Sequence, residues 1–294
     1  MNESNHSTAP TIGVFDSGFG GLTVLRALIE KLPRARFAFV GDTARLPYGS
    51  KSRRTIARYA AQSAQFLVRE QGAEYLVIAC NTASALALDA IQEAVPVPVL
   101  GVIEPGATAA RLASKTNDVL VIATNATVQS QAYTAACSAQ GLRALEKACP
   151  LLVPLVEEGW TDHPVTEEVI DIYLNELRAE AGAHGLNPDT LVLGCTHYPL
   201  LRRLIERAVR PGVKVIDSAE ATAQVAAQIF NGGGGPILTE SAPANSVRVE
   251  SNSSQEQQTE IRCFATDSVE KFERLGSRFL GRPVGKVELL DLGG

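Results

Sequence analysis

Two cysteines stand in matching surroundings, and both could take part in proton transfer. Cys195 follows the short apolar run 191–193 and Gly194, and it is followed by Thr196 and His197. An apolar run that ends at a glycine predicts a buried strand, and the apolar spacing after the histidine predicts a helix. We therefore expect Cys195 at the carboxyl end of a strand, where open α/β sheets bind ligands. The neighbouring helix N-terminus is expected to lower the pKa of the thiol from its usual value of about 8.5.

The segment 75–84, YLVIACNTAS, repeats this arrangement. An apolar run leads to Cys80, and Asn81 and Thr82 follow it before a helical segment that extends through residue 95. A free cysteine is most often only a small buried hydrophobic residue. Two thiols that face one pocket would instead suit a reaction in which one group removes a proton and the other returns a proton on the opposite face.

A carboxylate follows the first predicted strand, 11–15, in a similar position. Asp16 and Ser17 stand at the end of this strand, and a glycine-rich turn leads to an amphipathic helix over 22–32. Asp16 could act as a general base or orient one, and it could equally serve only as the N-cap of the helix. The glycines follow a GxGG pattern and not the GxGxxG fingerprint of dinucleotide sites, so the turn gives little support for a bound nucleotide.

Two other polar segments allow both a structural and a functional interpretation. Pro-Tyr-Gly at 47–49 is a stiff turn. It could be a simple turn with an aromatic hydroxyl at its tip, or it could supply a pocket wall through Tyr48 and the N–H of Gly49. Farther along, Glu157 and Glu158 stand near a predicted helix start, where acidic side chains interact favourably with the helix dipole.

Composition excludes several classes of protein. The chain has 294 residues, 45% hydrophobic residues, only 5% aromatic residues and a net charge of −5. Charges of both signs are interspersed, so no basic patch indicates a nucleic-acid partner, and no apolar run has the length of a membrane span. The first ten residues lack the apolar core of a signal peptide, and we expect a cytoplasmic protein.

The cysteine pattern is typical of free thiols. The chain has five cysteines, and none forms a CxxC pair that would indicate zinc. An odd number of cysteines in a cytoplasmic protein also argues against a disulfide framework. Cys137, Cys149 and Cys263 lack the strand-end surroundings and the polar neighbours, so we expect them to be structural.

The order of predicted strands and helices indicates an α/β protein with two domains, each a mostly parallel sheet flanked by helices. The first domain is discontinuous, combines 11–104 with 217–294, and carries Asp16 and Cys80. The second domain, 105–216, carries Cys195 and His197. Each domain then offers one cysteine to the cleft between the domains, where we place the active site.

Three segments mark the organisation of the chain. Glu104-Pro105-Gly106 breaks the pattern and is interpreted as a crossing between domains. The strand predicted over 118–123 ends in Thr124 and Asn125, so the second domain begins like the first, with threonine and asparagine in place of aspartate and serine. The segment 231–260 is poor in apolar residues and is predicted to be a flexible insertion.

Six segments resemble the motifs of one known family. They are VFDSGFGGLTVL (14–25), DTARLPYGSKS (42–52), VIACNTAS (77–84), VIATNATVQSQAY (121–133), VPLVEEG (153–159) and LGCTHYPLL (193–201). In order and spacing the chain resembles the bacterial glutamate racemases of the cofactor-independent Asp/Glu racemase superfamily. The resemblance implies a pseudosymmetric two-domain fold, glutamate as the substrate, no cofactor, and D-glutamate as a product for peptidoglycan synthesis.

The resemblance also implies roles for individual residues. Cys80 and Cys195 would be the paired acid/base thiols, with Asp16 assisting the first and His197 assisting the second. Glu157, which has Glu158 beside it, matches a further acidic helper of some members. The implied substrate contacts are Asp16, Ser17, Tyr48, Gly49, Asn81, Thr82, Thr196 and His197. Members of the family commonly form homodimers, and a cell-wall precursor activates some of them.

Three other classes of function remain as alternatives. An enzyme of related chemistry could racemise aspartate or another amino acid, or could be a decarboxylase, although a decarboxylase would keep only one thiol. A protein that binds an anion or metabolite on the same sheets would not exchange the α-proton. A redox sensor would form a reversible disulfide between Cys80 and Cys195 and would show no turnover.

Overall fold

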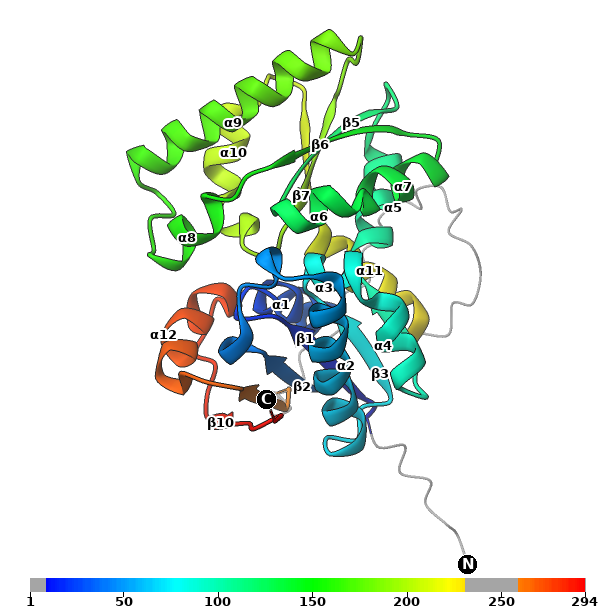
Figure 1. The fold of residues 1–294 in the computed structure, drawn as a ribbon, viewed down its shortest axis with the longest axis vertical. Coiled ribbons are helices and arrows are strands. Elements are labelled where there is room, and N and C mark those ends of the chain that lie inside the picture. The colour runs from blue at the N-terminus through cyan, green and yellow to red at the C-terminus, as the bar shows by residue number, and fades with distance from the viewer. Residues whose placement is uncertain (1–8, 231–258, 294) are drawn as a thin grey trace, which may run out of the picture.

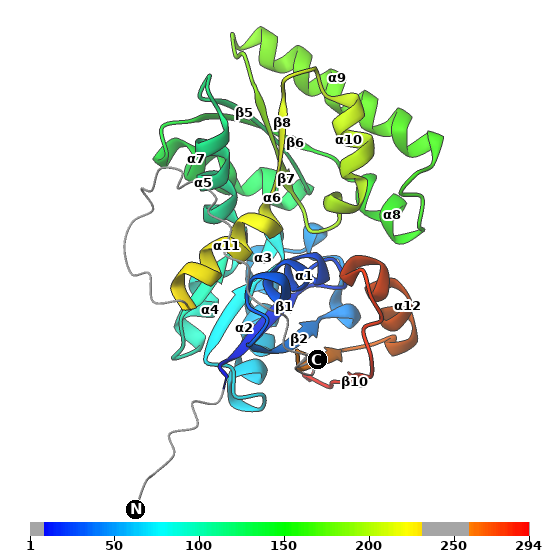
Figure 2. The same ribbon diagram turned by 180° about the vertical axis from the view of Figure 1, so that it is seen from behind.

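The computed structural model describes residues 9–230 and 259–293, and these residues form two sheets flanked by helices (Figures 1 and 2). Within them, the larger sheet has six strands in the order β10-β9-β2-β1-β3-β4, and the smaller has four in the order β6-β5-β7-β8. All neighbouring strands in both sheets are parallel. The predicted α/β fold with two parallel sheets is therefore confirmed.

The described residues form ten strands, six in the larger sheet and four in the smaller. Those of the larger sheet are β1 (Thr11–Asp16), β2 (Arg36–Gly41), β3 (Tyr75–Ile78), β4 (Val99–Gly101), β9 (Ile261–Ala265) and β10 (Val287–Leu289). Those of the smaller sheet are β5 (Asp118–Ala123), β6 (Arg143–Ala148), β7 (Thr190–Gly194) and β8 (Lys214–Asp217). The central strands β1, β3, β5 and β7 are buried along their whole length, as expected for strands covered on both faces.

Helices cover both faces of the larger sheet. One face packs on α1 (Leu22–Lys31), α11 (Ser218–Phe230) and α12 (Val269–Leu280). The other packs on α2 (Arg53–Arg69), α3 (Asn81–Leu86) and α4 (Leu88–Ala94). Alternate residues of β1 point to opposite faces of the sheet. Ile12 and Val14 pack in the core on the α1 face, and Phe15 packs in the core on the α2 face.

The smaller sheet is covered in the same way. One face packs on α8 (Leu152–Glu157), α9 (Pro164–Ala183) and α10 (Arg202–Ala208), and the other on α5 (Ile103–Ala113) and α7 (Ala132–Ala139). Helix α6 (Asn125–Ser130) follows β5, and the 3₁₀ turns are η1 (Thr43–Arg45), η2 (Tyr48–Ser50) and η3 (Tyr198–Leu201). The core on the α1 face of the larger sheet continues into the smaller sheet, since it contains side chains of α1 as well as of β7 and α10.

The two sheets repeat one topology. The order β2-β1-β3-β4 in the larger sheet corresponds strand by strand to β6-β5-β7-β8 in the smaller. Cys80 follows β3 and Cys195 follows β7, so the two cysteines occupy equivalent places in the two sheets. The pseudosymmetry of the fold therefore places one thiol at the carboxyl-terminal edge of each sheet, the edge at which such sheets bind ligands.

The carboxyl-terminal segment returns to the larger sheet, where β9 pairs with β2 and β10 pairs with β9. Residues from both ends of the described chain therefore share one sheet. Most of the predicted insertion at 231–260 lies outside the described residues.

The structure corrects two details of the predicted organisation. Glu104, Pro105 and Gly106 do not interrupt the pattern but lie in the first turn of α5, where a proline is tolerated because the first N–H groups of a helix have no partner within the helix. The strands β6 and β10 were not predicted. Both lie at sheet edges, and β6 has the polar sequence RALEKA and only partly buried residues, so it lacks the apolar run by which central strands are recognised.

Phe272 of α12 ties the carboxyl-terminal segment to the larger sheet. Its ring is fully buried and its centroid lies 5.9 Å from those of Phe19 and Phe39. Because truncation to alanine leaves a cavity among these rings, we expect Phe272→Ala to lower the free energy of unfolding by about 3–5 kcal/mol. Urea unfolding followed by circular dichroism measures the change.

Leu289→Ala is the matched control for this prediction. Leu289 lies on β10 and is 70% exposed, so its truncation should change the free energy of unfolding by no more than about 0.5 kcal/mol. If Phe272→Ala cost as little as this control, the aromatic cluster would not be what holds α12 on the sheet.

Candidate active site

A cavity of about 390 Å³ lies where the carboxyl-terminal edges of the two sheets meet. It brings together nearly all the residues that the sequence singled out. These lining residues are Ser17, Tyr48, Gly49, Cys80, Asn81, Thr82, Glu157, Cys195, Thr196 and His197. Asp16 is the predicted site residue that does not line the cavity. The volume is that of a small-molecule site.

Cys80 lies in the half of the cavity formed by the larger sheet. Its sulfur lies 3.3 Å from the hydroxyl oxygen of Ser17 and accepts a hydrogen bond of 3.4 Å from the backbone N–H of Ala83, at the start of α3. Burial, reinforced by the charge of Asp16, raises the pKa of the Cys80 thiol to about 12, although the two hydrogen-bonding neighbours act in the opposite direction. Loss of hydration therefore outweighs the helix N–H donor at this thiol.

Cys195 lies in the opposite half and has a different partner. Its sulfur lies 3.9 Å from Nδ1 of His197, and Nε2 of the same imidazole lies 3.3 Å from Oε1 of Glu157. Burial acts to lower the pKa of His197, but its contacts with Cys195 and Glu157 outweigh burial and raise the pKa to about 10. The imidazole is therefore held in its protonated form at neutral pH, beside the sulfur.

Glu157 is itself held as a carboxylate. Burial acts to raise its pKa, but the hydrogen bond and the charge of His197, followed by the charge of Lys271, leave the pKa lowered. Nζ of Lys271 on α12 lies 3.8 Å from Oε2 of Glu157, and the ring of Phe279 on the same helix packs edge-on against His197 at 5.0 Å. The carboxyl-terminal helix thus supports the imidazole and the carboxylate of the smaller sheet's half.

The structure corrects the interpretation of Glu157 as a residue at a helix start. Glu157 is the last residue of α8, where a negative charge meets the unfavourable end of the helix dipole. The position of the Glu157 carboxylate is therefore explained by its contacts with His197 and Lys271 and not by the helix dipole. The neighbouring Glu158 is exposed, so Glu157 is the glutamate of this pair that faces the imidazole.

Asp16 lies beneath the cavity wall and not at its surface. Its side chain is 1% exposed, Oδ2 accepts a hydrogen bond of 2.9 Å from the N–H of Gly18, and Oδ1 has no partner among the described residues. Burial raises the pKa of this carboxyl, and the charge of His197 opposes the rise. Asp16 therefore interacts electrostatically with both halves of the site, because its charge also acts on Cys80.

Threonines from the two halves meet at one side of the cavity. The hydroxyl oxygen of Thr82 lies 3.0 Å from that of Thr124 and 3.3 Å from that of Thr127, and the last two lie 3.0 Å apart. Thr124 and Asn125 also line the cavity, and they were not predicted as site residues from the sequence. The signal that could have done so is their position after β5, which repeats the position of Asp16 and Ser17 after β1.

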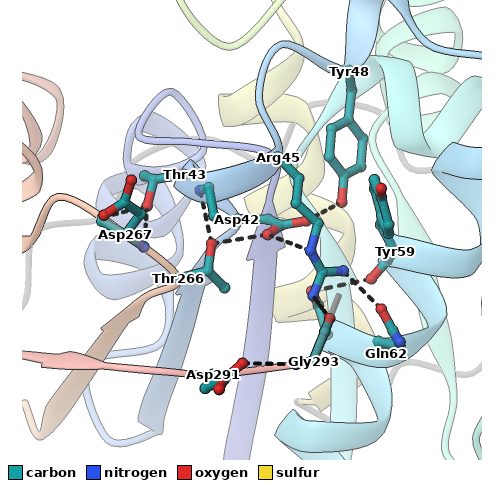
Figure 3. Close-up of polar contacts among 12 residues, drawn as sticks. Asp42, Thr43, Arg45, Tyr48, Tyr59, Gln62, Thr266, Asp267, Asp291 and Gly293 are labelled. Carbon is teal, nitrogen blue, oxygen red and sulfur yellow. Dashed lines mark hydrogen bonds and ion pairs between the residues drawn. The ribbon is translucent and has the colours of Figure 1, made fainter.

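Tyr48 forms a wall of the cavity, and its hydroxyl is not at an exposed turn tip as one interpretation expected. The side chain is 1% exposed, and its hydroxyl donates a hydrogen bond of 2.5 Å to Oδ2 of the buried Asp42 (Figure 3). The hydroxyl of Thr266 donates to Oδ1 of the same carboxylate at 2.9 Å. Burial raises the pKa of Asp42, with the hydrogen bond from Tyr48 acting against the rise.

Arg45 extends this network, since its Nε lies 3.6 Å from Oδ1 of Asp42. Its guanidinium lies 4.4 Å from the centre of the Tyr59 ring and donates hydrogen bonds to Gln62 at 2.7 Å and to the carbonyl oxygen of Gly293 at 3.1 Å (Figure 3). The segment that supplies Tyr48 and Gly49 is thereby fixed both to α2 and to the end of the described chain.

The glycine turn after β1 lets the Cys195 segment approach closely. A Cβ atom at Gly20 would lie 2.2 Å from Oγ1 of Thr196 and 2.6 Å from Nδ1 of His197. Both distances are too short for a Cβ atom, so any other residue at this position would push the two side chains away. The hydroxyl of Thr23 also donates to the carbonyl oxygen of Thr196 at 3.1 Å. The GxGG pattern therefore serves contact between the two halves of the cavity.

No group of three or more His, Cys, Asp or Glu side chains in the described residues is arranged to hold a metal ion. None of the helices in the same part of the chain combines the length and the apolar character needed to cross a membrane.

Comparison with known proteins agrees with this geometry. A family model described as Asp/Glu/hydantoin racemase matches residues 12–226. The glutamate racemase of Koribacter versatilis is 53% identical over 292 residues, which cover 97% of this chain and 98% of the relative.

Solved structures show the same two-domain α/β fold. Glutamate racemase isoform RacE1 from Bacillus anthracis has a TM-score of 0.82 and 36% identity and covers 97% of this chain and 98% of its own. Escherichia coli glutamate racemase, in complex with L-glutamate and the activator UDP-MurNAc-Ala, has a TM-score of 0.71 and 26% identity and covers 97% of this chain and 100% of its own. The chain belongs to the Asp/Glu/hydantoin racemase family, and it is a racemase.

Proposed function

We propose that the substrate is glutamate and that the chain interconverts its L and D enantiomers with two thiols and no cofactor. The observation that carries the proposal is the placement of Cys80 and Cys195 in one cavity, from equivalent ends of two repeated sheets and with unlike partners. The names of the relatives support glutamate as the substrate.

Neutral polar groups would bind the substrate. Among the lining residues no lysine or arginine occurs, and the protonated His197 supplies the positive charge. Hydroxyl and amide groups of Ser17, Asn81, Thr82 and Thr196, together with the Tyr48 and Gly49 segment, would then orient the two carboxylates and the amino group. Donors fixed near the α-carboxylate would also stabilise the negative charge that develops when the α-proton leaves.

Proton transfer would run between the two sulfurs. In one direction Cys195, stabilised as a thiolate by the adjacent imidazolium, removes the α-proton, and the Cys80 thiol donates its proton to the opposite face of the carbon. One C–H bond breaks and another forms, so configuration inverts and the two cysteines exchange protonation states. In the reverse direction Asp16 would take the proton of Cys80 while the imidazolium of His197 returns its proton to Cys195, so that Cys80 is the thiolate and Cys195 the thiol.

The wider role follows from the product. We propose that the enzyme acts in the cytoplasm, works as a homodimer, and supplies D-glutamate for peptidoglycan synthesis without a nucleic-acid or membrane partner. The complex of the E. coli enzyme with UDP-MurNAc-Ala supports the proposal that a cell-wall precursor of this kind regulates the present chain. The division of the chain into 11–104 with 217–294 and 105–216 would let the two halves of the site close over the substrate.

The first test is isotope exchange. Purified protein incubated with L-glutamate in D₂O, without added cofactor, should lose the optical rotation of the substrate while deuterium enters the α-position of the product. Polarimetry and NMR of the same sample measure both. L-Aspartate at the same concentration is the control for specificity and should react more slowly.

Two results would contradict the proposed function. Faster racemisation of L-aspartate than of L-glutamate would assign a different substrate. An absence of both rotation change and exchange, with UDP-MurNAc-Ala added as well as without it, would favour a binding protein.

Glu157 should control the alkaline limit of activity. Contact with Glu157 helps to raise the pKa of His197 to about 10, so activity that needs the imidazolium is present below that pH and is lost as pH rises through it. Glu157→Gln removes this contribution, and we expect the alkaline limb of the kcat/KM profile to move to lower pH. Loss of a hydrogen bond to a charged group should also lower kcat/KM by about 10- to 100-fold near neutral pH.

Glu158→Gln is the matched control, since its side chain is exposed one residue farther along the chain. It should leave both the alkaline limb and kcat/KM as in the unaltered enzyme. An unchanged alkaline limb in Glu157→Gln, or equal shifts in both variants, would show that Glu157 does not tune His197.

A further inference from the structure

Tyr133 connects the two halves of the site, although it is not itself at the cavity surface. Its side chain is completely buried, and it lies on α7, which covers the smaller sheet. Its hydroxyl donates a hydrogen bond of 2.7 Å to Oδ1 of Asn81. Asn81 directly follows Cys80 and belongs to the helix that covers the larger sheet, so the bond crosses from one half to the other.

This hydrogen bond determines which way the Asn81 amide points. Burial raises the pKa of Tyr133 above its usual range, so the hydroxyl keeps its proton, and it donates that proton to Oδ1 of Asn81. The carbonyl oxygen of the amide therefore faces Tyr133, and Nδ2 faces away from it. Nδ2 is buried and has no partner among the described residues, while Asn81 lines the cavity.

A buried N–H donor at a cavity is a site for an acceptor from the ligand, because buried polar groups in proteins are nearly always hydrogen-bonded. A carboxylate accepts hydrogen bonds and donates none. An amide turned the other way would present its oxygen to that carboxylate and repel it. The orientation that Tyr133 imposes is thus the one that recognises an anion.

The ring of Tyr133 is fixed by two glycines. A Cβ atom at Gly194 would lie 2.9 Å from Cε2 of the ring, and one at Gly106 would lie 3.3 Å from Cε1 and from the hydroxyl oxygen. Gly194 directly precedes Cys195. One side chain therefore contacts the neighbours of both cysteines, and its ring has little freedom to move.

We propose that Tyr133 is a positioning residue for the reaction, whose hydroxyl holds the Asn81 amide with its N–H group toward a substrate carboxylate. The inference rests on the proposed function for the identity of the substrate. Tyr133 does not touch the reacting atoms and acts through Asn81.

Tyr133→Phe tests the proposal, because it keeps the ring against the two glycines and removes only the hydroxyl. Without that hydrogen bond the amide can turn, and we expect KM for L-glutamate to rise about five- to tenfold while kcat changes by less than about twofold. Tyr75→Phe is the matched control. Tyr75 is also buried but begins β3, at the end of the strand remote from Cys80, and its loss of a hydroxyl should leave both constants unchanged.

A double-mutant cycle separates positioning from a general structural role. If Tyr133 acts through Asn81, then Tyr133→Phe should have no further effect on KM in the background of Asn81→Ala. Equal effects in both backgrounds would overturn the proposal. So would an unchanged KM in the single variant Tyr133→Phe.

A readout that needs no turnover keeps this test independent of the proposed function. In protein labelled with ¹⁵N-asparagine, the signal missing from Asn81→Ala identifies the side-chain amide of Asn81. This signal should shift or broaden in Tyr133→Phe and stay unchanged in Tyr75→Phe. An unshifted signal in Tyr133→Phe would overturn the inference, whereas absence of racemisation by the unaltered enzyme would overturn the proposed function alone.

Discussion

Burial of ionisable groups is the constraint on which the site depends. Cys80, Cys195, Asp16 and His197 are each less than 9% exposed, so hydration stabilises their charges only weakly. Each charge must then be balanced by a neighbour. The imidazolium of His197 has Glu157 on one side and the Cys195 sulfur on the other. Cys80 has hydrogen-bond donors but no adjacent cation among the described residues, and its pKa rises to about 12. Two thiols of the same chemical type thereby have unlike neighbours.

The repeated sheets place the two cysteines in equivalent positions, and contacts between the two halves give each cysteine different neighbours. Equivalent strand ends place one cysteine in each half. Contacts that break the repeat then decide what each thiol can do. Helix α12 reaches the smaller sheet's half through Lys271 and Phe279, and Gly20 allows close approach of the segment after Cys195. A pseudosymmetric fold with asymmetric partners suits a reaction whose two directions are chemically similar but use opposite faces of one carbon.

Local patterns were enough to predict most of the fold and the lining of the cavity. The strands predicted over 11–15 and 118–123 lie where they were expected, as β1 and β5, because buried parallel strands are continuous apolar runs. The contacts that tune the site could not be predicted in this way, since they join residues distant in sequence. Glu157 meets His197 and Lys271 only in the folded chain, and its position along α8 gave the wrong interpretation. The buried hydroxyl of Tyr48 depends likewise on Thr266 and Asp42.

The two-thiol mechanism is tested most directly by α-hydrogen exchange in single cysteine variants. Cys80→Ser and Cys195→Ser are each incubated in D₂O with L-glutamate and, separately, with D-glutamate, and Cys263→Ala, on β9, serves as the control. We expect racemisation to fall about 10²- to 10⁴-fold in both serine variants. Each variant should retain exchange with only one enantiomer, and the retained enantiomers should be opposite. Racemisation near the unaltered rate in both variants, or retained exchange with the same enantiomer, would contradict the two-thiol mechanism.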